Sequence, residues 1–189
     1  MATLATEVNF RDWSIDAPTV GPRGNKSSRI SQNGQAIRLQ LCPTGQSMKA
    51  PFGATTYANE ERSRMNLDLQ VADEKLLQRL REMDAWFVQQ LGSDSEDRPL
   101  VAEKGNYLPL LKTKMDINRV RCWTPSGDRM ATNGVAWGSS VFTPIVVVGR
   151  VWYMNRRMGV TLEVTDLVIH DAPTEPATFP FIRGDPRLM

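Results

Sequence analysis

Apolar and polar residues alternate with a period of two over most of the chain, which predicts a protein built mainly of strands. The clearest segment is RMNLDLQV at residues 64–71, a half-buried antiparallel strand, and a shorter one is expected at residues 36–41. Further strands are predicted within residues 107–117, 118–123 and 139–154. Pro109 interrupts the first of these, TPSGD forms a turn after the second, and Pro144 leaves the third as one long strand or a strand pair.

One segment has the period of a helix. Asp73 is a suitable N-cap for a helix over residues 73–91. Its apolar residues form one stripe, made of Leu76, Leu77, Leu80, Met83, Phe87, Val88 and Leu91. Trp86 lies roughly 120° from the centre of that stripe at about 100° per residue, so it is expected at the border or exposed.

The stretch GRVWYMNRRMGVTLEV at residues 149–164 is predicted to be a hairpin that turns at Asn155, Arg156 and Arg157. In its second strand the inward set begins as Val160, Leu162 and Val164 and continues as Leu167 and Ile169. Because this change of parity needs one extra residue, a β-bulge is predicted near Thr165 and Asp166.

These elements predict one domain of mainly β structure with one inserted helix, an OB-like curved antiparallel sheet or small barrel over residues 36–171. Residues 1–35 are polar and lack periodicity, so a loosely ordered basic arm is expected there. An acidic loop is expected at residues 92–105, and the proline-rich residues 172–189 are expected to be a tail.

Composition argues against several classes of protein. Cys42 and Cys122 have no metal-type spacing, and His170 is the chain's one histidine, so neither a metal site nor a Ser-His-Asp triad is expected. Glu163, Asp166 and Asp171 follow no metal-binding motif, and no phosphate-binding glycine loop is present. No cofactor and no enzymatic activity are expected. The longest apolar run, residues 144–148, is too short to cross a bilayer, and residues 1–13 lack the basic flank and apolar run of a secretory signal. Together these features predict an intracellular protein without a membrane partner.

The formal net charge of +2 is unevenly distributed. Residues 17–59 hold five cations and no anion, and residues 107–157 hold eight cations and two anions, or +6. The helix has a net charge of −1 and the acidic loop −2. Such segregation suits a face that binds a polyanion, although strands also carry exposed Lys and Arg for solubility.

Strand parity places cations beside aromatic rings. Arg121 and Trp123 share one face of their strand with Arg119, and Arg150 shares a face with Trp152. Cations contact phosphates and rings stack on unpaired bases, so both faces suit single-stranded nucleic acid. The sequence leaves open whether Trp152 stacks on bases or packs in the core. The candidate contacts are Arg38, Lys49, Phe52, Lys112, Lys114, Arg119, Arg121, Trp123, Arg150, Trp152, Arg156 and Arg157.

The order of four stretches resembles the single-stranded DNA-binding proteins of nucleocytoplasmic large DNA viruses, the African swine fever virus type, and their uncharacterised relatives. The stretches are MKAPFGATTY, RMNLDLQV followed by ADEKLLQRLREMDAWFVQQL, YLPLLKTKM, and VVVGRVWYMNRRMGVTLEVTDLVI. The resemblance implies an OB-like β-barrel that binds single-stranded DNA with little sequence preference in replication, repair or transcription. It also implies a location in the nucleus or at a viral replication site in the host cytoplasm.

By motif position, the resemblance assigns the hairpin's Arg150, Trp152, Arg156 and Arg157 to binding and places residues 51–53 near the sheet. The chain departs from the family in its hairpin turn, where relatives usually have glycine. The alternative is a structural or assembly protein that binds another copy or another protein through the same sheet or through the Trp86 side of the helix. The sequence does not distinguish DNA from RNA.

Overall fold

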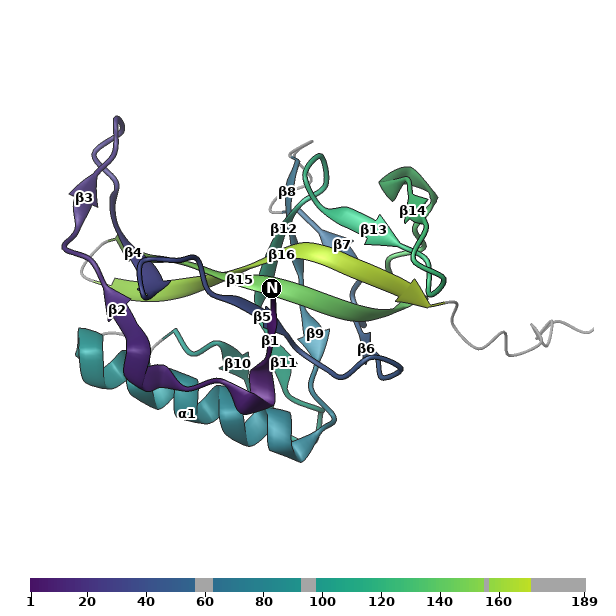
Figure 1. Ribbon diagram of the computed structural model, residues 1–189, viewed down its shortest axis with the longest axis horizontal. Coiled ribbons are helices and arrows are strands. Elements are labelled where there is room, and N and C mark those ends of the chain that lie inside the picture. Colours follow the sequence, from purple (N-terminus) through teal and green to yellow (C-terminus); the bar gives the residue numbers. More distant parts are fainter. Residues whose placement is uncertain (57–62, 93–97, 155–156, 171–189) are drawn as a thin grey trace, which may run out of the picture.

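A computed structural model describes residues 1–56, 63–92, 98–154 and 157–170 (Figure 1). Its elements in chain order are β1 (Thr3–Leu4), η1 (Ala5–Glu7), η2 (Phe10–Asp12), β2 (Trp13–Ile15), β3 (Thr19–Val20), β4 (Lys26–Gln32), β5 (Arg38–Gln40), β6 (Met48–Lys49), β7 (Ala54–Thr55), β8 (Arg64–Leu67), β9 (Leu69–Gln70), α1 (Glu74–Leu91), β10 (Val101–Ala102), β11 (Leu110–Leu111), β12 (Thr113–Asp116), β13 (Arg121–Trp123), β14 (Arg129–Met130), η5 (Thr132–Gly134), β15 (Val141–Met154) and β16 (Arg157–His170). The expected tail at residues 172–189 lies outside the described residues.

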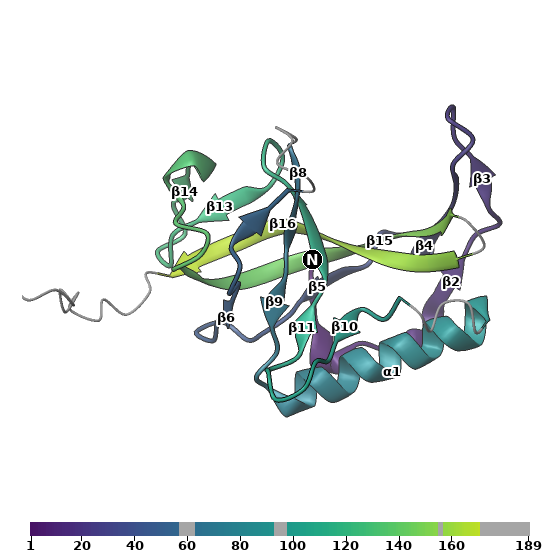
Figure 2. The same cartoon turned by 180° about the vertical axis from the view of Figure 1, so that it is seen from behind.

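Helix α1 lies where the periodicity predicts it. The Asp73 side chain accepts a hydrogen bond from the Leu76 N–H at 2.7 Å and caps the first turn. The predicted stripe faces the interior, and its fully buried members are Leu76, Leu80, Met83 and Phe87. Figures 1 and 2 show α1 along one side of the long β15–β16 hairpin. No helix in the described part of the chain is long and apolar enough to span a membrane.

Strands β15 and β16 form the centre of the main sheet, whose order is β1-β5-β15-β16-β12-β8-β7. Strand β15 is one continuous strand of 14 residues that includes Pro144, so of the two predicted alternatives the single long strand is present. Its alternate residues Phe142, Val146 and Val148 are buried, and they pack with Leu39 and Leu162 of the neighbouring strands into the core under α1. The mainly β fold with one inserted helix is therefore confirmed.

The sheet is mixed, and the expectation of an antiparallel sheet is wrong. Strands β12 and β13 both pair with β16 in parallel, and β1 pairs with β5 in parallel. Strand β12 covers residues 162–164 of β16, and β13 covers residues 166–168. Strands β12 and β13 therefore lie one after the other along the same edge of β16. The chain keeps its direction between them through a turn in which the Val120 N–H donates a hydrogen bond to the Asp116 carbonyl at 2.8 Å. In the described residues the sheet path is open, ending at β1 and β7.

The β-bulge predicted near Thr165 is present. Ile145 pairs with Asp166 and Val146 pairs with Val164, so Thr165 has no partner across the hairpin. A second irregularity, which the sequence pattern did not reveal, falls at Gly149 and Arg150, between the pairs Val148–Leu162 and Val151–Val160. Both bulges bend and twist the long hairpin.

Residues 1–35 are part of the fold, which corrects the expectation of a loosely ordered arm. Strand β1 pairs with β5, β2 and β3 pair with β4, and β4 pairs with β15. Trp13 is buried among Phe10, Trp86 and Phe87, with ring centroids 5.1, 5.6 and 6.2 Å away. Trp86 is therefore partly buried at the border of the apolar stripe, as predicted.

The sequence pattern concealed β4 because two of its buried residues, one on each face of the strand, are serines. Ser28 and Ser31 are buried, and each has a hydroxyl partner. The Ser28 hydroxyl lies 3.0 Å from the Tyr153 hydroxyl, and the Ser31 hydroxyl lies 3.1 Å from that of Ser14. A small hydroxyl side chain with a hydrogen-bond partner is tolerated in the interior, but it gives no apolar signal.

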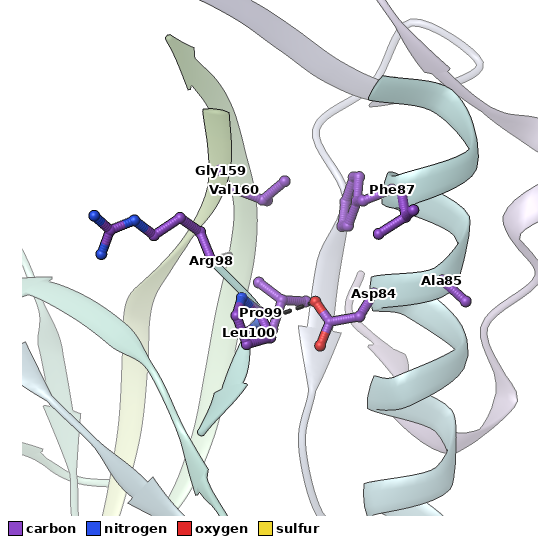
Figure 3. Close-up of a pocket in the computed structure, with 9 residues that line it drawn as sticks. Asp84, Ala85, Phe87, Arg98, Pro99, Leu100, Gly159 and Val160 are labelled. Atoms are coloured by element: carbon purple, nitrogen blue, oxygen red, sulfur yellow. Dashed lines mark hydrogen bonds between the residues drawn. The ribbon is translucent and has the colours of Figure 1, made fainter. Parts of the chain in front are cut away.

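A small second sheet has the strand order β10-β11-β9. It replaces part of the loop expected at residues 92–105, since β10 lies within that range. Asp84 of α1 ties this sheet to the helix by accepting a hydrogen bond from the Leu100 N–H at 2.9 Å (Figure 3). Burial raises the pKa of Asp84 to about 6, although the bonds from the Leu100 and Val101 N–H groups act to lower it.

We expect Asp84 to make stability depend on pH. The Asp84 carboxyl binds a proton more tightly in the folded chain than in the unfolded chain, where its pKa has the ordinary value of 3.8. The free energy of unfolding therefore falls as pH rises from about 4 to about 6. The Asp84→Asn variant keeps an acceptor for Leu100 and loses this dependence. Relative to the wild type it gains stability by up to about 1.4 kcal/mol per pH unit over that range. Urea unfolding of both proteins at pH 4.5 and pH 7, with exposed Asp12→Asn as control, measures the difference, and parallel pH profiles would contradict it.

Candidate nucleic-acid interface

Cross-strand pairing places most of the candidate residues on one face of the main sheet, opposite the face that carries the core. Residues paired across strands project to the same side. One row of such pairs crosses five strands as Arg38, Val147, Glu163, Lys114 and Asn66. We call this side of β4, β5, β15, β16, β12, β13 and β8 the outer face. The remaining rows are Gln40–Ile145–Asp166–Arg121, Thr143–Val168–Trp123, Lys49–Val141–His170, Arg29–Arg150, Ser27–Trp152–Gly159 and Met154–Arg157.

The two bulges decide which residues reach the outer face. Glu163 and Asp166 are three residues apart, and they share a face only because Thr165 is extra. In the same way, the bulge at Gly149 and Arg150 brings Trp152 to the face that Val147 occupies. A Cβ on Gly149 would lie 2.9 Å from the Thr161 carbonyl oxygen, so this bulge requires a residue without a side chain.

Trp152 is on the outer face and does not pack in the core. It is half-buried, whereas its neighbour Val151 is fully buried on the opposite side. The indole lies over Gly159, where an added Cβ would come within 2.5 Å of the ring. One side of the Trp152 ring thus packs directly against Gly159, which has no side chain. The prediction that Arg150 and Trp152 share one face of their strand is confirmed.

An open hollow of about 780 Å³ lies beside Trp152 and is rich in cations. The cations that line it are Lys26, Arg29, Arg64, Arg119 and Arg150, against Asp116 and Glu163. Arg64 lies 3.9 Å from Glu163. Within the described part of the chain, Arg29, Arg119 and Arg150 form no salt bridge, so their charge is available to an anion.

A second hollow, of about 380 Å³, continues from the first because Trp152 and Thr161 line both. Its cations are Arg98, Lys112 and Lys114. Burial lowers the pKa of Lys114, and the nearby charge of Arg64 lowers it further, while Asp68 acts to raise it. Lys114 also contacts the side-chain oxygen of Asn66. A phosphate near Lys114 would relieve the repulsion between these two cations.

Asp166 holds two of the candidate arginines in place. Its carboxylate accepts hydrogen bonds from the Arg38 and Arg121 guanidinium groups, both at 2.8 Å, and Arg121 approaches through both Nε and Nη2. Burial acts to raise the pKa of Asp166, but hydrogen bonds from Arg121, Thr165 and Trp123 outweigh it, and the pKa is lowered. Two guanidinium groups on one carboxylate leave a local charge of +1 held in a fixed geometry.

Trp123 lies at the far end of the outer face from Trp152. Its Nε1 donates a hydrogen bond to Asp166 at 3.2 Å, and the Arg129 guanidinium carbon lies 4.9 Å from the ring centroid. The ring is therefore oriented at its edge by a carboxylate and at one face by a cation. Trp123 and Asp166 also line an open hollow together with Thr143 and His170.

The other candidates lie at the margins. Lys49 and Arg157 are exposed at opposite ends of the outer face, Phe52 is exposed on a turn near the small sheet, and Arg156 lies outside the described residues. Sequence reasoning missed Arg29 and Arg64. Arg64 was detectable because it precedes Asn66 on the polar side of a clear period-two strand, whereas Arg29 was hidden by the serines of β4.

No protein-family model matches the sequence, and no curated protein matches it. Among solved structures, gp2.5, a single-stranded DNA-binding protein encoded by bacteriophage T7, is similar with a TM-score of 0.50 and 12% identity, covering 79% of this chain and 91% of that chain. The single-stranded DNA-binding protein from bacteriophage Enc34 in complex with ssDNA has a TM-score of 0.49 and 4% identity, covering 82% and 94%. At 12% identity, the likeness to gp2.5 describes the fold.

Proposed function

We propose that the protein binds single-stranded DNA through its outer face, without catalysis and with little sequence preference. The observation that carries this proposal is the position of Trp152, which rests on Gly159 between two cation-lined hollows. Arg119 and Arg150 lie beside it and form no salt bridge among the described residues. Arginines contact phosphates and the ring stacks on a base, and neither contact reads base identity. The fold shared with gp2.5, itself a single-stranded DNA-binding protein, supports the same function.

The proposal includes an OB-like architecture and a role in DNA replication, repair or transcription inside the cell. The resemblance of the sequence to proteins of nucleocytoplasmic large DNA viruses supports a nuclear location or a viral replication site in the host cytoplasm.

The test is fluorescence anisotropy of a labelled single strand of about 30 nucleotides, which is long enough for at least one site of OB type. Titrations at low and moderate salt should show affinity that falls steeply, because each phosphate contact contributes about 0.7 to the slope of log K against log salt. Duplex of the same sequence should compete poorly, since its bases are not available for stacking. RNA of the same sequence, used as a competitor, measures the preference for DNA.

The competing function is assembly with other protein chains through the same face. An apolar protein interface does not weaken steeply with salt. Absence of single-strand binding at low salt by a folded sample would refute the DNA-binding proposal. Concentration-dependent self-association in the same buffer would then favour assembly.

A further inference from the structure

The outer face of the main sheet continues onto the small sheet along one unbroken polar edge. From Arg64 to Gln70 every second residue points away from the core, while Leu67 and Leu69 between them are fully buried. Gln70 pairs with Leu110, and Leu110 pairs with Ala102, so these three side chains share the face that Asn66 and Asp68 begin. A ligand that crosses β16, β12 and β8 therefore reaches the small sheet without leaving this surface.

A third hollow, of about 640 Å³, lies on the small sheet at that end. It is continuous with the second hollow, because Asp68 and Lys112 line both. Its walls carry the large exposed apolar residues Phe52, Tyr107 and Leu108, which are 66%, 84% and 49% exposed. Single exposed rings are ordinary on a protein surface, but three such residues around one hollow indicate a binding surface.

Hydrogen-bonded turns present both rings. The turn that carries Phe52 is closed by a bond of 2.9 Å from the Gly53 N–H to the Ala50 carbonyl. Gly53 is in the left-handed region at φ +63°, and an added Cβ would lie 3.2 Å from the Gly138 nitrogen, so this turn is tightly placed. A bond of 3.2 Å from the Tyr107 N–H to the Lys104 carbonyl closes the second turn.

We propose that Phe52 and Tyr107 form a second base-stacking site, to which a single strand crosses from Trp152 over Lys114 and Lys112. The occupant is a run of unpaired nucleotides, because this third hollow joins the second hollow, which Arg98, Lys112 and Lys114 line. Lys104 and Lys112 also line the third hollow, where they can contact the phosphates between stacked bases. An aromatic ring at each end with lysines between them matches the alternation of base and phosphate along a strand. This inference rests on the proposed function.

The test compares Phe52→Ala, Tyr107→Ala and the double variant with the wild type, using a labelled 30-nucleotide oligothymidylate at fixed salt. Each single variant should weaken binding about 5-fold or more, as expected for loss of one base–ring stack. The salt slope should stay unchanged, because no cation is removed. Val20→Ala, an exposed apolar residue on β3 that is 64% exposed, is the control and should bind like the wild type.

A second readout is photo-crosslinking of the wild-type protein to an oligonucleotide that carries 5-iododeoxyuridine, with crosslinked peptides identified by mass spectrometry. Crosslinks to peptides that contain Phe52 or Tyr107 are expected. The second site would be overturned if the wild type binds, both single variants keep an affinity within 2-fold of the wild type, and crosslinks are confined to the Trp152 region. That outcome would leave the proposed function intact. No binding by the folded wild type would overturn both.

Discussion

Reversing the charges of Arg119 and Arg150 together should nearly abolish binding of single-stranded DNA. Neither guanidinium is paired with a carboxylate in the described structure, and both line the hollow beside Trp152. Removing two phosphate contacts lowers the slope of log K against log salt by about 1.4. Placing two carboxylates there adds repulsion, so we expect Arg119→Glu with Arg150→Glu to weaken binding by about 100-fold or more at low salt, measured by anisotropy.

The matched control reverses two charges on other surfaces. Arg11 on η2 and Lys75 on α1 are exposed and line none of the hollows on the outer face. Arg11→Glu with Lys75→Glu changes the net charge by the same amount, so it separates a local contact from the overall field of the protein. Equal losses in the two double variants would show that binding depends on net charge and not on this groove.

Truncating Trp13 to alanine should cost about 3–5 kcal/mol of stability, the usual cost of removing a buried Trp side chain. Trp13 is 6% exposed and joins the N-terminal segment to α1 through Phe10, Trp86 and Phe87. The measurement is the urea midpoint at constant m-value. Trp13→Phe should cost much less, because it keeps a ring and removes an indole N–H that has no hydrogen-bond partner in the described structure.

This result would measure how much residues 1–35 contribute to the stability of the folded domain. A loss below about 1 kcal/mol for Trp13→Ala would mean that the segment contributes little to the core. A large loss would also bear on the assembly alternative, because Phe10 and Trp13 cover part of the Trp86 side of the helix within the same chain. That side would then be occupied by the protein's own N-terminal segment.

Much of the local structure was predictable because local signals are strong there. The Asp73 cap and the apolar stripe predict α1, and the parity change between Val164 and Leu167 predicts the bulge at Thr165. The pairing of Arg150 with Trp152 on one face also follows from period two. The second bulge was missed because residues 145–148 and 151–153 are apolar on both faces of β15, so parity gives no sign of the extra residue between them.

The partners of the charged residues could not be predicted in the same way. Arg38 and Asp166 are 128 residues apart in the chain, and nothing local connects them. The same holds for the contact between the Trp152 ring and Gly159, because this contact depends on the register of the hairpin. Cations that the sequence does not distinguish thus divide into two groups. Arg38 and Arg121 are held by Asp166, whereas Arg119 and Arg150 form no salt bridge with any residue that the structure describes.

The sequence by itself determined the elements: a mainly β chain with one capped helix, a bulged hairpin, and basic strands that carry aromatic rings. These follow from periodicity, capping and parity, which act between residues close in the chain. Only the tertiary structure decided that residues 1–35 pack into the fold, that the sheet is mixed, and that the cations gather on one continuous face. Those features depend on strand pairing and side-chain contacts between residues distant in the chain, which local pattern does not encode.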